Sequence, residues 1–257
     1  MPRSPQKFDP VASFLAENFP GPDPEKAFKE LVSQRTQDHG LFLDFSITWL
    51  KSLVRDYEKS CNGKEACKRF VCSLDDSNKM KSWYSIADKL VRELREKEDT
   101  PEYRLKYSLN NFHRTMTDLV RLRVVCSFLS DVYAFEKLLK NAYLSNPSHR
   151  VHFALRKQKD TIRLRPVERR SAHRSIKYLL ISHEGPGVFL ELQIMTTFQA
   201  AWDQKDHPLI YEKLRENPER AKKLFNKYED ELVHNMGGSL HVLDTLFDQI
   251  KRKLGKP

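Results

Sequence analysis

The stretch VFLELQIMTTFQAAWDQKDH, residues 188–207, changes its hydrophobic period partway along. Its first half alternates between apolar and polar side chains, which is typical of a β-strand, and its second half has helical spacing. One acidic side chain, Glu191, stands where a buried strand would have another Val or Leu. A buried carboxylate needs a cation or hydrogen-bond donors, because an unpaired buried charge is very unfavourable. The stretch therefore predicts a strand followed by a helix, with Glu191 directed at a polar partner.

Three further segments predict strands of the same sheet. They are RLRVVCSFL (121–129), RVHFALRKQ (150–158) and HRSIKYLLIS (173–182), and EGPG (184–187) predicts the turn before the next strand. Between them, DVYAFEKLLKNAYL (131–144) predicts a helix with Asp131 at its N-cap. Strands interleaved with helices predict an α/β or α+β fold, with a mixed β-sheet of about five strands flanked by helices.

Helical patterns dominate both ends of the chain. Residues 1–99 contain several amphipathic segments, and we expect a helical region that packs on the core. Residues 100–213 contain the predicted strands and are expected to form the core itself. Residues 214–257 predict one or two helices with a break at Gly237-Gly238. We expect these three regions to form one compact domain.

The composition limits the class of protein. The 257 residues are 39% apolar, and no segment approaches the roughly 18 apolar residues of a membrane helix. The N-terminus lacks the apolar core of a secretory signal, so we expect a soluble, cytoplasmic protein. The four cysteines lack metal-binding spacing and are expected to be reduced thiols.

The charge of the chain points to an anionic partner. The net charge is +10, and residues 163–177 (RLRPVERRSAHRSIK) hold six Lys or Arg against one acid. Such a surplus is favoured when nucleotide phosphates, RNA or an acidic protein neutralise it, although plain solubility also explains a positive net charge.

Two acidic residues of separate segments add a second signal. Asp118 precedes the predicted strand that begins near residue 121, and Glu191 lies within another strand. If these strands are neighbours in the sheet, the two carboxylates can face each other. Carboxylates beside a group of cations are typical of a Mg²⁺–polyphosphate site, in which hard oxygen ligands hold the metal and Arg or Lys hold the phosphates.

Six short motifs now occur in a familiar order. They are RLK (104–106), DLVRLR (118–123), KDTI (159–162), AHRSIK (172–177), ELQIMT (191–196) and DHPLIYEK (206–213). In this order and at these separations, they resemble the synthetase domain of RelA/SpoT-type alarmone synthetases, including the small single-domain members. The resemblance covers roughly residues 100–213 and implies a nucleotidyltransferase-like synthetase fold.

The resemblance also implies an activity. The enzyme would be a pyrophosphokinase that transfers the β,γ-diphosphate of ATP to the ribose 3′-hydroxyl of a purine nucleotide, with GDP and GTP giving ppGpp and pppGpp. Mg²⁺ would be the cofactor. By the resemblance, Asp118 is a metal ligand, and Glu191 assists the metal and accepts the proton of the attacking hydroxyl. The family's paired HD-type hydrolase motif is missing from the N-terminal helices, so we expect synthesis without degradation.

The remaining site residues follow from the same motifs. Arg104, Lys106 and Arg114 would hold the ATP phosphates, Lys159 and Arg169 would complete the phosphate site, and His173 and Gln193 would contact the nucleotides. On an ideal helix, residues 104 and 106 point about 200° apart, so their convergence requires a non-helical conformation of RLK. We expect Trp202 to be a core residue and His207 to make a structural hydrogen bond.

Simpler structural roles compete with these assignments. Asp118 can be an ordinary turn residue, and Glu191 can pair with Arg121 or Arg123 across the sheet. Arg104, Lys106 and Arg114 can be a solvated helix face.

The sequence departs from the family pattern mainly on the acceptor side. Ala172-His173 replaces a Gly-Tyr pair whose Tyr stacks on the acceptor base, Lys177 replaces a His, Met195 an Arg, and Arg121 a Gly. Three hypotheses follow: a synthetase with an unusual pocket that accepts another purine nucleotide, such as an adenosine species; a toxin-like enzyme that pyrophosphorylates the tRNA 3′ end; or a binding protein that has lost synthesis. The sequence leaves open whether the chain is a monomer or a homo-oligomer.

Overall fold

The computed structural model describes residues 9–62, 72–75, 80–96, 101–163, 173–185, 187–206 and 227–254. Its helices are α1 (Pro10–Asn18), α2 (Pro24–Arg35), α3 (Gln37–Asn62), α4 (Trp83–Glu96), α5 (Pro101–Lys106), α6 (Phe112–Thr115), α7 (Leu129–Ser145), α8 (Pro147–His152), α9 (Thr197–Asp206) and α12 (Lys227–Leu254). Its strands are β1 (Cys72–Asp75), β2 (Arg121–Cys126), β3 (Phe153–Asp160), β4 (Ile176–Ser182) and β5 (Phe189–Thr196).

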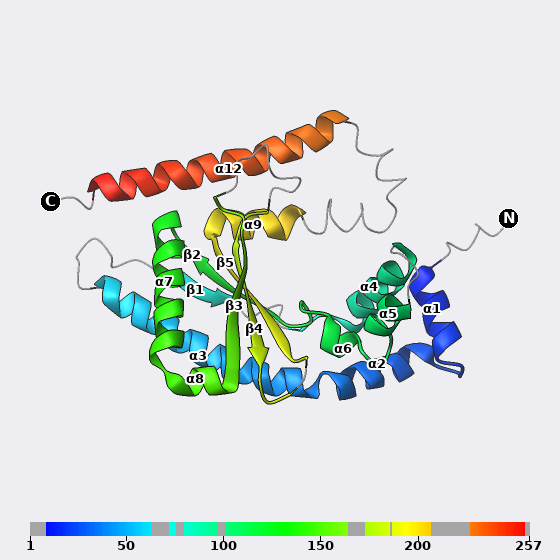
Figure 1. The fold of residues 1–257 in the computed structure, drawn as a ribbon. Coiled ribbons are helices and arrows are strands. Elements are labelled where there is room, and N and C mark those ends of the chain that lie inside the picture. The colour runs from blue at the N-terminus through cyan, green and yellow to red at the C-terminus, as the bar shows by residue number, and fades with distance from the viewer. Residues whose placement is uncertain are drawn as a thin grey trace.

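The five strands form one mixed sheet in the order β1-β2-β5-β4-β3 (Figure 1). β2 and β5 are parallel, and the other three pairs are antiparallel. This confirms the predicted fold class of a mixed five-stranded sheet flanked by helices. β1 was not predicted, and it comes from the N-terminal region that the sequence suggested to be helical.

The two faces of the sheet differ in chemistry. Alternate residues of the central strands form an apolar face, and all of these are buried: Leu122 and Val124 on β2, Ile176, Tyr178 and Leu180 on β4, and Leu190, Leu192 and Ile194 on β5. They join one core cluster with α3 and α7. The residues that alternate with them carry the charged side chains of β2, β4 and β5. This second face, which we call the polar face, positions the candidate site.

The first two helices, α1 and α2, each begin at an aspartate that caps the helix. The Asp9 carboxylate accepts a hydrogen bond from the Val11 amide at the start of α1, and Asp23 caps α2 in the same way. A proline follows each Asp at the first helical position, where its missing N–H costs nothing. In Figure 1, α1, α2, α4 and α5 lie together at one end of the molecule, and α3 runs below the sheet.

The C-terminal helix α12 corrects two sequence predictions. It continues through Gly237-Gly238 without a break, because its contacts with the core outweigh a propensity cost of about 1 kcal/mol per glycine. Asp131 is not the N-cap of α7. That position is Phe128, whereas Asp131 is buried in the first turn and accepts hydrogen bonds from Tyr57 and from Lys251 of α12. None of the described helices is long and apolar enough to cross a membrane.

Candidate active site

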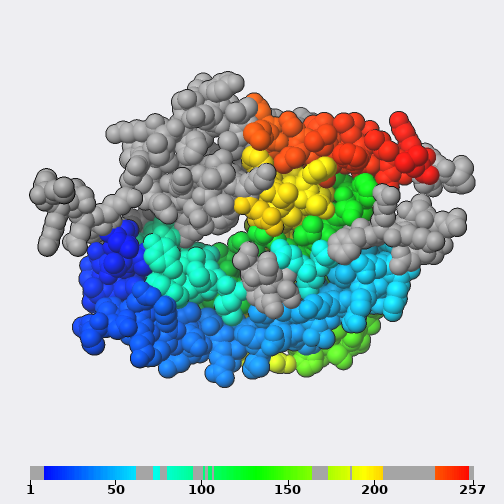
Figure 2. Space-filling model, turned by 180° about the vertical axis from the view of Figure 1, so that it is seen from behind, coloured from blue at the N-terminus to red at the C-terminus, as the bar shows by residue number. Residues whose placement is uncertain are grey.

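Polar side chains of neighbouring strands lie in rows across the polar face. The strand registers align Arg123 on β2 with Gln193 on β5, and Gln193 with Lys177 on β4. The adjacent row aligns Arg121 with Glu191. Because each strand alternates its side chains between the two faces, these five residues all point to the same side of the sheet. Figure 2 shows the opposite side of the molecule from Figure 1, with a hollow between α4 and α9.

Glu191 is held by one of its two carboxylate oxygens. Oε1 accepts hydrogen bonds from Arg121 Nε at 3.0 Å and Gln193 Nε2 at 2.6 Å, and Lys177 Nζ lies 3.8 Å from it. The pair with Arg121 is the cross-sheet salt bridge that the sequence raised as an alternative role. Oε2 makes none of these contacts within the described part of the chain. The residue is 8% exposed, and its carboxylate lies beside two cationic side chains.

Asp118 lies in the turn before β2 and binds two lysines. Lys81 Nζ is 2.7 Å from Oδ2 and Lys89 Nζ is 2.5 Å from Oδ1. Burial alone would raise the pKa of the Asp118 carboxyl, but the two ammonium groups outweigh burial and hold the pKa well below its usual range. Asp118 is therefore ionised, and both of its oxygens are occupied.

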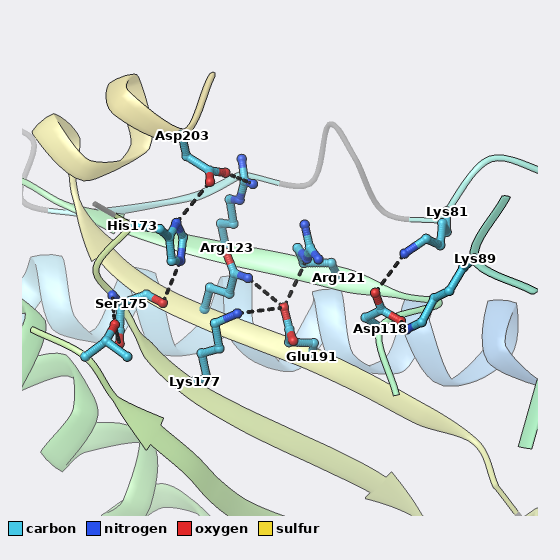
Figure 3. Close-up of polar contacts among 12 residues, drawn as sticks. Lys81, Lys89, Asp118, Arg121, Arg123, His173, Ser175, Lys177, Glu191 and Asp203 are labelled. Carbon is cyan, nitrogen blue, oxygen red and sulfur yellow. Dashed lines mark hydrogen bonds and ion pairs between the residues drawn. The ribbon is translucent and has the colours of Figure 1, made fainter. Parts of the chain in front are cut away.

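The two predicted carboxylates lie at the same end of the sheet. The Val120 carbonyl accepts a 2.9 Å hydrogen bond from the Glu191 amide, so Asp118 is two residues from a backbone contact of Glu191. Arg121, which binds Glu191, also lies close enough to Lys81 to lower the pKa of that lysine, together with burial as the largest cause. Figure 3 shows both acidic side chains beside their cations in one view.

His173 is part of a hydrogen-bonded chain between β4 and α9. Its Nδ1 lies 2.9 Å from Asp203 Oδ1, and its Nε2 lies 3.0 Å from Ser175 Oγ (Figure 3). Asp203 Oδ2 also accepts a hydrogen bond from Arg123. Burial opposes ionisation of Asp203, but His173 and Arg123 lower its pKa to about 2. Both ring nitrogens of the imidazole therefore have partners inside the protein.

Two buried polar atoms of the polar face have no partner among the described residues. Arg123 Nε can donate a hydrogen bond and Gln193 Oε1 can accept one, and the part of the chain that the structure describes supplies neither. The two residues are paired in register and are 8% and 2% exposed, respectively. Unsatisfied buried polar atoms are rare in folded proteins and are often explained by a ligand or water. Their position beside Glu191 and Lys177 indicates where a polar ligand would bind.

The predicted phosphate-binding residues of the N-terminal motif lie on two short helices. Arg104 and Lys106 both belong to α5, so RLK does not have the non-helical conformation that convergence of the two residues would require. Arg104 is exposed, and Arg114 is exposed on α6. Gly187, at a φ of +78°, approaches α6 so closely that a Cβ there would lie 2.5 Å from the Arg114 Cα. The predicted turn before β5 therefore fixes Arg114 at the same end of the sheet as Glu191.

The other predicted residues are distributed as follows. Lys159 is exposed on the edge strand β3, beside Lys177 in register. Trp202 is 7% exposed on α9, as expected of a core residue. Arg169 and His207 lie outside the described residues. The structure thus brings Glu191, Gln193 and His173 to the polar face, with Asp118 at the same end of the sheet.

Several site residues escaped the sequence prediction. Arg123 and Asp203 have a usable signal. Arg123 is two residues from Arg121 on the same strand and so points to the same face, and Asp203 lies about two turns of α9 beyond β5. The sequence around Lys81 and Lys89 did not indicate that they would contact Asp118. They are ordinary lysines of a helical region until the fold brings them to Asp118.

The donor groups of the site fit a magnesium ion that is bound together with phosphates. Asp118 and Glu191 supply two carboxylates, and no cluster of three or more His, Cys, Asp or Glu placed to hold a metal occurs among the described residues. Mg²⁺ at phosphate sites is typically held by one or two carboxylates, with the remaining ligands from water and substrate phosphates. Glu191 Oε2 is available for this role, whereas Asp118 must first exchange a lysine.

Solved structures of small alarmone synthetases have a similar fold. The small alarmone synthetase 1 from Bacillus subtilis bound to its product pppGpp matches with a TM-score of 0.61 at 17% identity, covering 88% of this chain and 100% of that chain. The small alarmone synthetase 2 from Bacillus subtilis matches with a TM-score of 0.52 at 21% identity, covering 83% and 96%. A GTP pyrophosphokinase family protein from Streptococcus pneumoniae matches with a TM-score of 0.54 at 17% identity, covering 89% and 94%. No curated protein sequence matches the chain.

These likenesses show that the chain shares the fold of the small alarmone synthetases. The family described as "Region found in RelA / SpoT proteins" matches residues 78–216, more than half of the 257 residues. The chain therefore belongs to the RelA/SpoT family. The match begins ahead of Lys81 and Lys89, so both lysines lie within the family region.

Proposed function

We propose that the protein transfers the β,γ-diphosphate of ATP to the ribose 3′-hydroxyl of a purine nucleotide. The observation that carries this proposal is the geometry of Glu191. Arg121 and Gln193 fix the carboxylate through Oε1, and Oε2 has no described partner. A carboxylate with one oxygen held by the protein and the other directed to the site suits a general base.

The proposed reaction balances with groups of this chain. The ribose 3′-oxygen attacks the β-phosphorus of ATP and forms the new P–O bond. The bond from the β-phosphorus to the oxygen that links it to the α-phosphorus breaks, and AMP leaves with the electron pair. The hydroxyl proton passes to Glu191 Oε2. Phosphoryl transfer needs alignment and cations more than covalent help, and Arg121 and Lys177 lie beside the carboxylate to stabilise the developing charge.

Asp118 and Glu191 are the residues that we propose to hold Mg²⁺. When bound, this ion would neutralise part of the negative charge of the phosphates. Arg114 of α6 is proposed to hold the ATP phosphates together with Arg104 or Lys106 of α5, because a helical RLK does not direct both α5 residues to one site. Lys159 and Arg169 are proposed to extend the phosphate site.

The acceptor is proposed to lie next to His173. Asp203 and Ser175 fix the plane of the imidazole, so its face can stack on a base, as aromatic side chains do at nucleotide sites. Arg123 Nε and Gln193 Oε1 offer one donor and one acceptor nearby. Purine edges carry both kinds of group.

The test compares wild type with Glu191→Gln, using ATP and GDP, GTP, AMP or ADP as acceptors. Products are separated by anion exchange and identified by mass spectrometry. Removing the base should lower turnover by about 10²–10⁴-fold. Glu184→Gln is the matched control, because this exposed glutamate in the turn before β5 pairs only with His152 among the described contacts. A 3′-deoxy acceptor should give no product.

Three results would change the proposal. Near-normal turnover of Glu191→Gln would remove Glu191 from the chemistry. Label transferred from ATP to tRNA, with none on free nucleotides, would move the acceptor to the tRNA 3′ end. ATP binding without transfer to any acceptor would indicate a binding protein.

A further inference from the structure

Two cysteines face each other at one end of the β1–β2 pair. Cys72 and Cys126 are directly opposite in the antiparallel register, and both side chains are completely buried. Cys126 alternates along β2 with Arg123 and Val125 and follows Leu122 and Val124, so the pair lies on the apolar face of the sheet. Both thiols are free in the structure. Two oxidisable groups are therefore placed side by side in the core.

The backbone geometry of the pair matches that of a disulfide. Residues directly opposite each other in an antiparallel pair have Cα atoms about 4.5 or 5.5 Å apart, depending on their hydrogen bonding. The Cα atoms of disulfide-bonded cysteines are about 4.4–6.8 Å apart. The Cys126 thiol also hydrogen bonds to the Cys72 side chain. The two backbones therefore already suit an S–S bond between these side chains.

The strand that carries Cys72 is held mainly by its neighbour. β1 has only four residues and lies at the edge of the sheet beside β2 (Figure 1). Short edge segments open more readily than central strands, because fewer contacts hold them. A bond between Cys72 and Cys126 would close a loop that contains α4, α5 and α6. It would also fix β1 on β2, the strand that carries Arg121 and Arg123 of the candidate site.

We propose that Cys72 and Cys126 form a redox-sensitive pair: a peroxide converts the two thiols to a disulfide that fixes β1 on β2, and a small thiol reduces it again. One sulfur, as the thiolate, attacks the O–O bond of the peroxide, becomes a sulfenic acid and releases hydroxide. The second thiol attacks the sulfenic sulfur, the S–S bond forms and water leaves. In total, two thiols are oxidised and one hydrogen peroxide is reduced to two waters.

The buried position sets the order of events. Burial, and after it the hydrogen bond to Cys72, raises the pKa of the Cys126 thiol, so the closed core holds little of the reactive thiolate. The reaction therefore begins when the edge strand opens, and it ends in a closed core that protects the bond. Reduction by a dithiol reverses the sequence through a mixed disulfide.

The first test looks for the bond in the wild-type protein. The folded chain is treated with hydrogen peroxide, free thiols are blocked with iodoacetamide, and the digest is analysed by mass spectrometry without reduction. A cross-linked peptide that joins Cys72 to Cys126 should appear, and dithiothreitol should remove it. Cys61→Ala is the matched control and should give the same cross-link, because Cys61 is the more exposed free cysteine at the end of α3.

Three outcomes of this test would overturn the proposal. They are cross-links that join Cys61 or Cys67 to other cysteines in place of this pair, sulfinic acid at Cys72 or Cys126 with no cross-link, and two thiols that remain unmodified. Cys67 lies outside the described residues, so its cross-links are identified by mass alone.

The second test measures what the bond does to the fold. Oxidation should raise the thermal unfolding midpoint of wild type by about 5–10 °C, because a disulfide restricts the unfolded chain. Hydrogen exchange of the β1 amides should slow at the same time. Cys72→Ala and Cys126→Ala, each compared before and after oxidation, should show neither change. An unchanged or lower midpoint of cross-linked wild type would overturn the stabilising role, and the wild-type measurements stand even where a variant fails to fold.

Discussion

The apolar and polar faces of the sheet are built from the same strands, yet they are organised by different interactions. On β5, Leu190, Leu192 and Ile194 are completely buried against the helices. Between them, Glu191 and Gln193 are also nearly buried, but each is surrounded by polar groups. The two sets of residues are thus similarly buried, but in surroundings of different chemistry. One face is stabilised by removing apolar surface from water, and the other gains function from charges whose positions are fixed.

On the polar face, each carboxylate oxygen has its own set of partners. Glu191 uses Oε1 for three cationic or donor groups, and Asp118 uses one oxygen for each lysine. Such contacts contribute little net stability, because the desolvation of buried ions offsets their attraction. We therefore expect substitutions on the polar face to impair the reaction and leave the fold intact. Substitutions on the apolar face should mainly destabilise the fold.

The largest expected effect on stability tests this difference with two adjacent residues. Leu192→Ala should lower the free energy of unfolding by about 2–5 kcal/mol, because it leaves a cavity in the core. Gln193→Ala should cost only about 1 kcal/mol, since it removes one hydrogen bond to Glu191. Urea denaturation of both variants measures the two values. Equal losses would show that the two faces contribute alike to the fold.

A smaller effect concerns a buried carboxylate that has no cation. Asp244 of α12 accepts a 2.6 Å hydrogen bond from Thr196 at the end of β5. Burial is the main cause that raises its pKa, to about 6, and the nearby Asp248 acts in the same direction. Between about pH 4 and 6, the folded protein therefore binds more protons than the unfolded chain. The contribution of Asp244 to stability is complete near pH 4 and is lost as the pH rises through 6.

Asp244→Asn removes this titration. The free energy of unfolding of wild type minus that of the variant should increase by about 1–2 kcal/mol when the pH falls from 7 to 4.5. Denaturation of both proteins across this range checks the value, and the subtraction cancels other titrating groups. A flat difference would mean that Asp244 is ionised like an ordinary surface carboxylate. The cation-paired carboxylates of the polar face would then differ from it less than we argue.

Sequence patterns predicted the parts of the fold that are locally encoded. β2, β4 and β5 have clear alternation, and the proline-led helices α1 and α2 have good caps. β1 has only four residues, CSLD, and is a strand because it pairs with β2. Asp131 looked like a cap because local sequence does not show that α12 returns to bind it.

The candidate site divides in the same way. Glu191 and Asp118 could be selected from the motifs, and Glu191 from the interrupted strand pattern alone. Their partners could not all be found, because Lys81 and Lys89 meet Asp118 only through the packing of α4 on the sheet. Arg123 and Asp203 fall between these cases. The alternation of β2 indicates that Arg123 lies on the polar face. Its contact with Asp203, however, depends on how α9 packs after β5.

The smallest expected effect sharpens the comparison within the polar face itself. Asp203→Asn removes the charge that orients His173 and binds Arg123, while the apolar core is untouched. The KM for the acceptor should rise about fivefold, which corresponds to about 1 kcal/mol, and the KM for ATP should stay unchanged. Gln204→Ala, an exposed neighbour on α9, is the control. Steady-state kinetics with each substrate varied in turn measures both constants.

His173→Ala should raise the KM for the acceptor more than Asp203→Asn does, because it removes the ring itself. Adding Asp203→Asn to His173→Ala should then have little further effect, since residues that act through one contact are not additive. Additive losses would show that Asp203 acts through Arg123 rather than through His173. Equal increases in the KM for ATP would place this hydrogen-bonded chain on the donor side, and the polar face would then be divided differently between its two nucleotides.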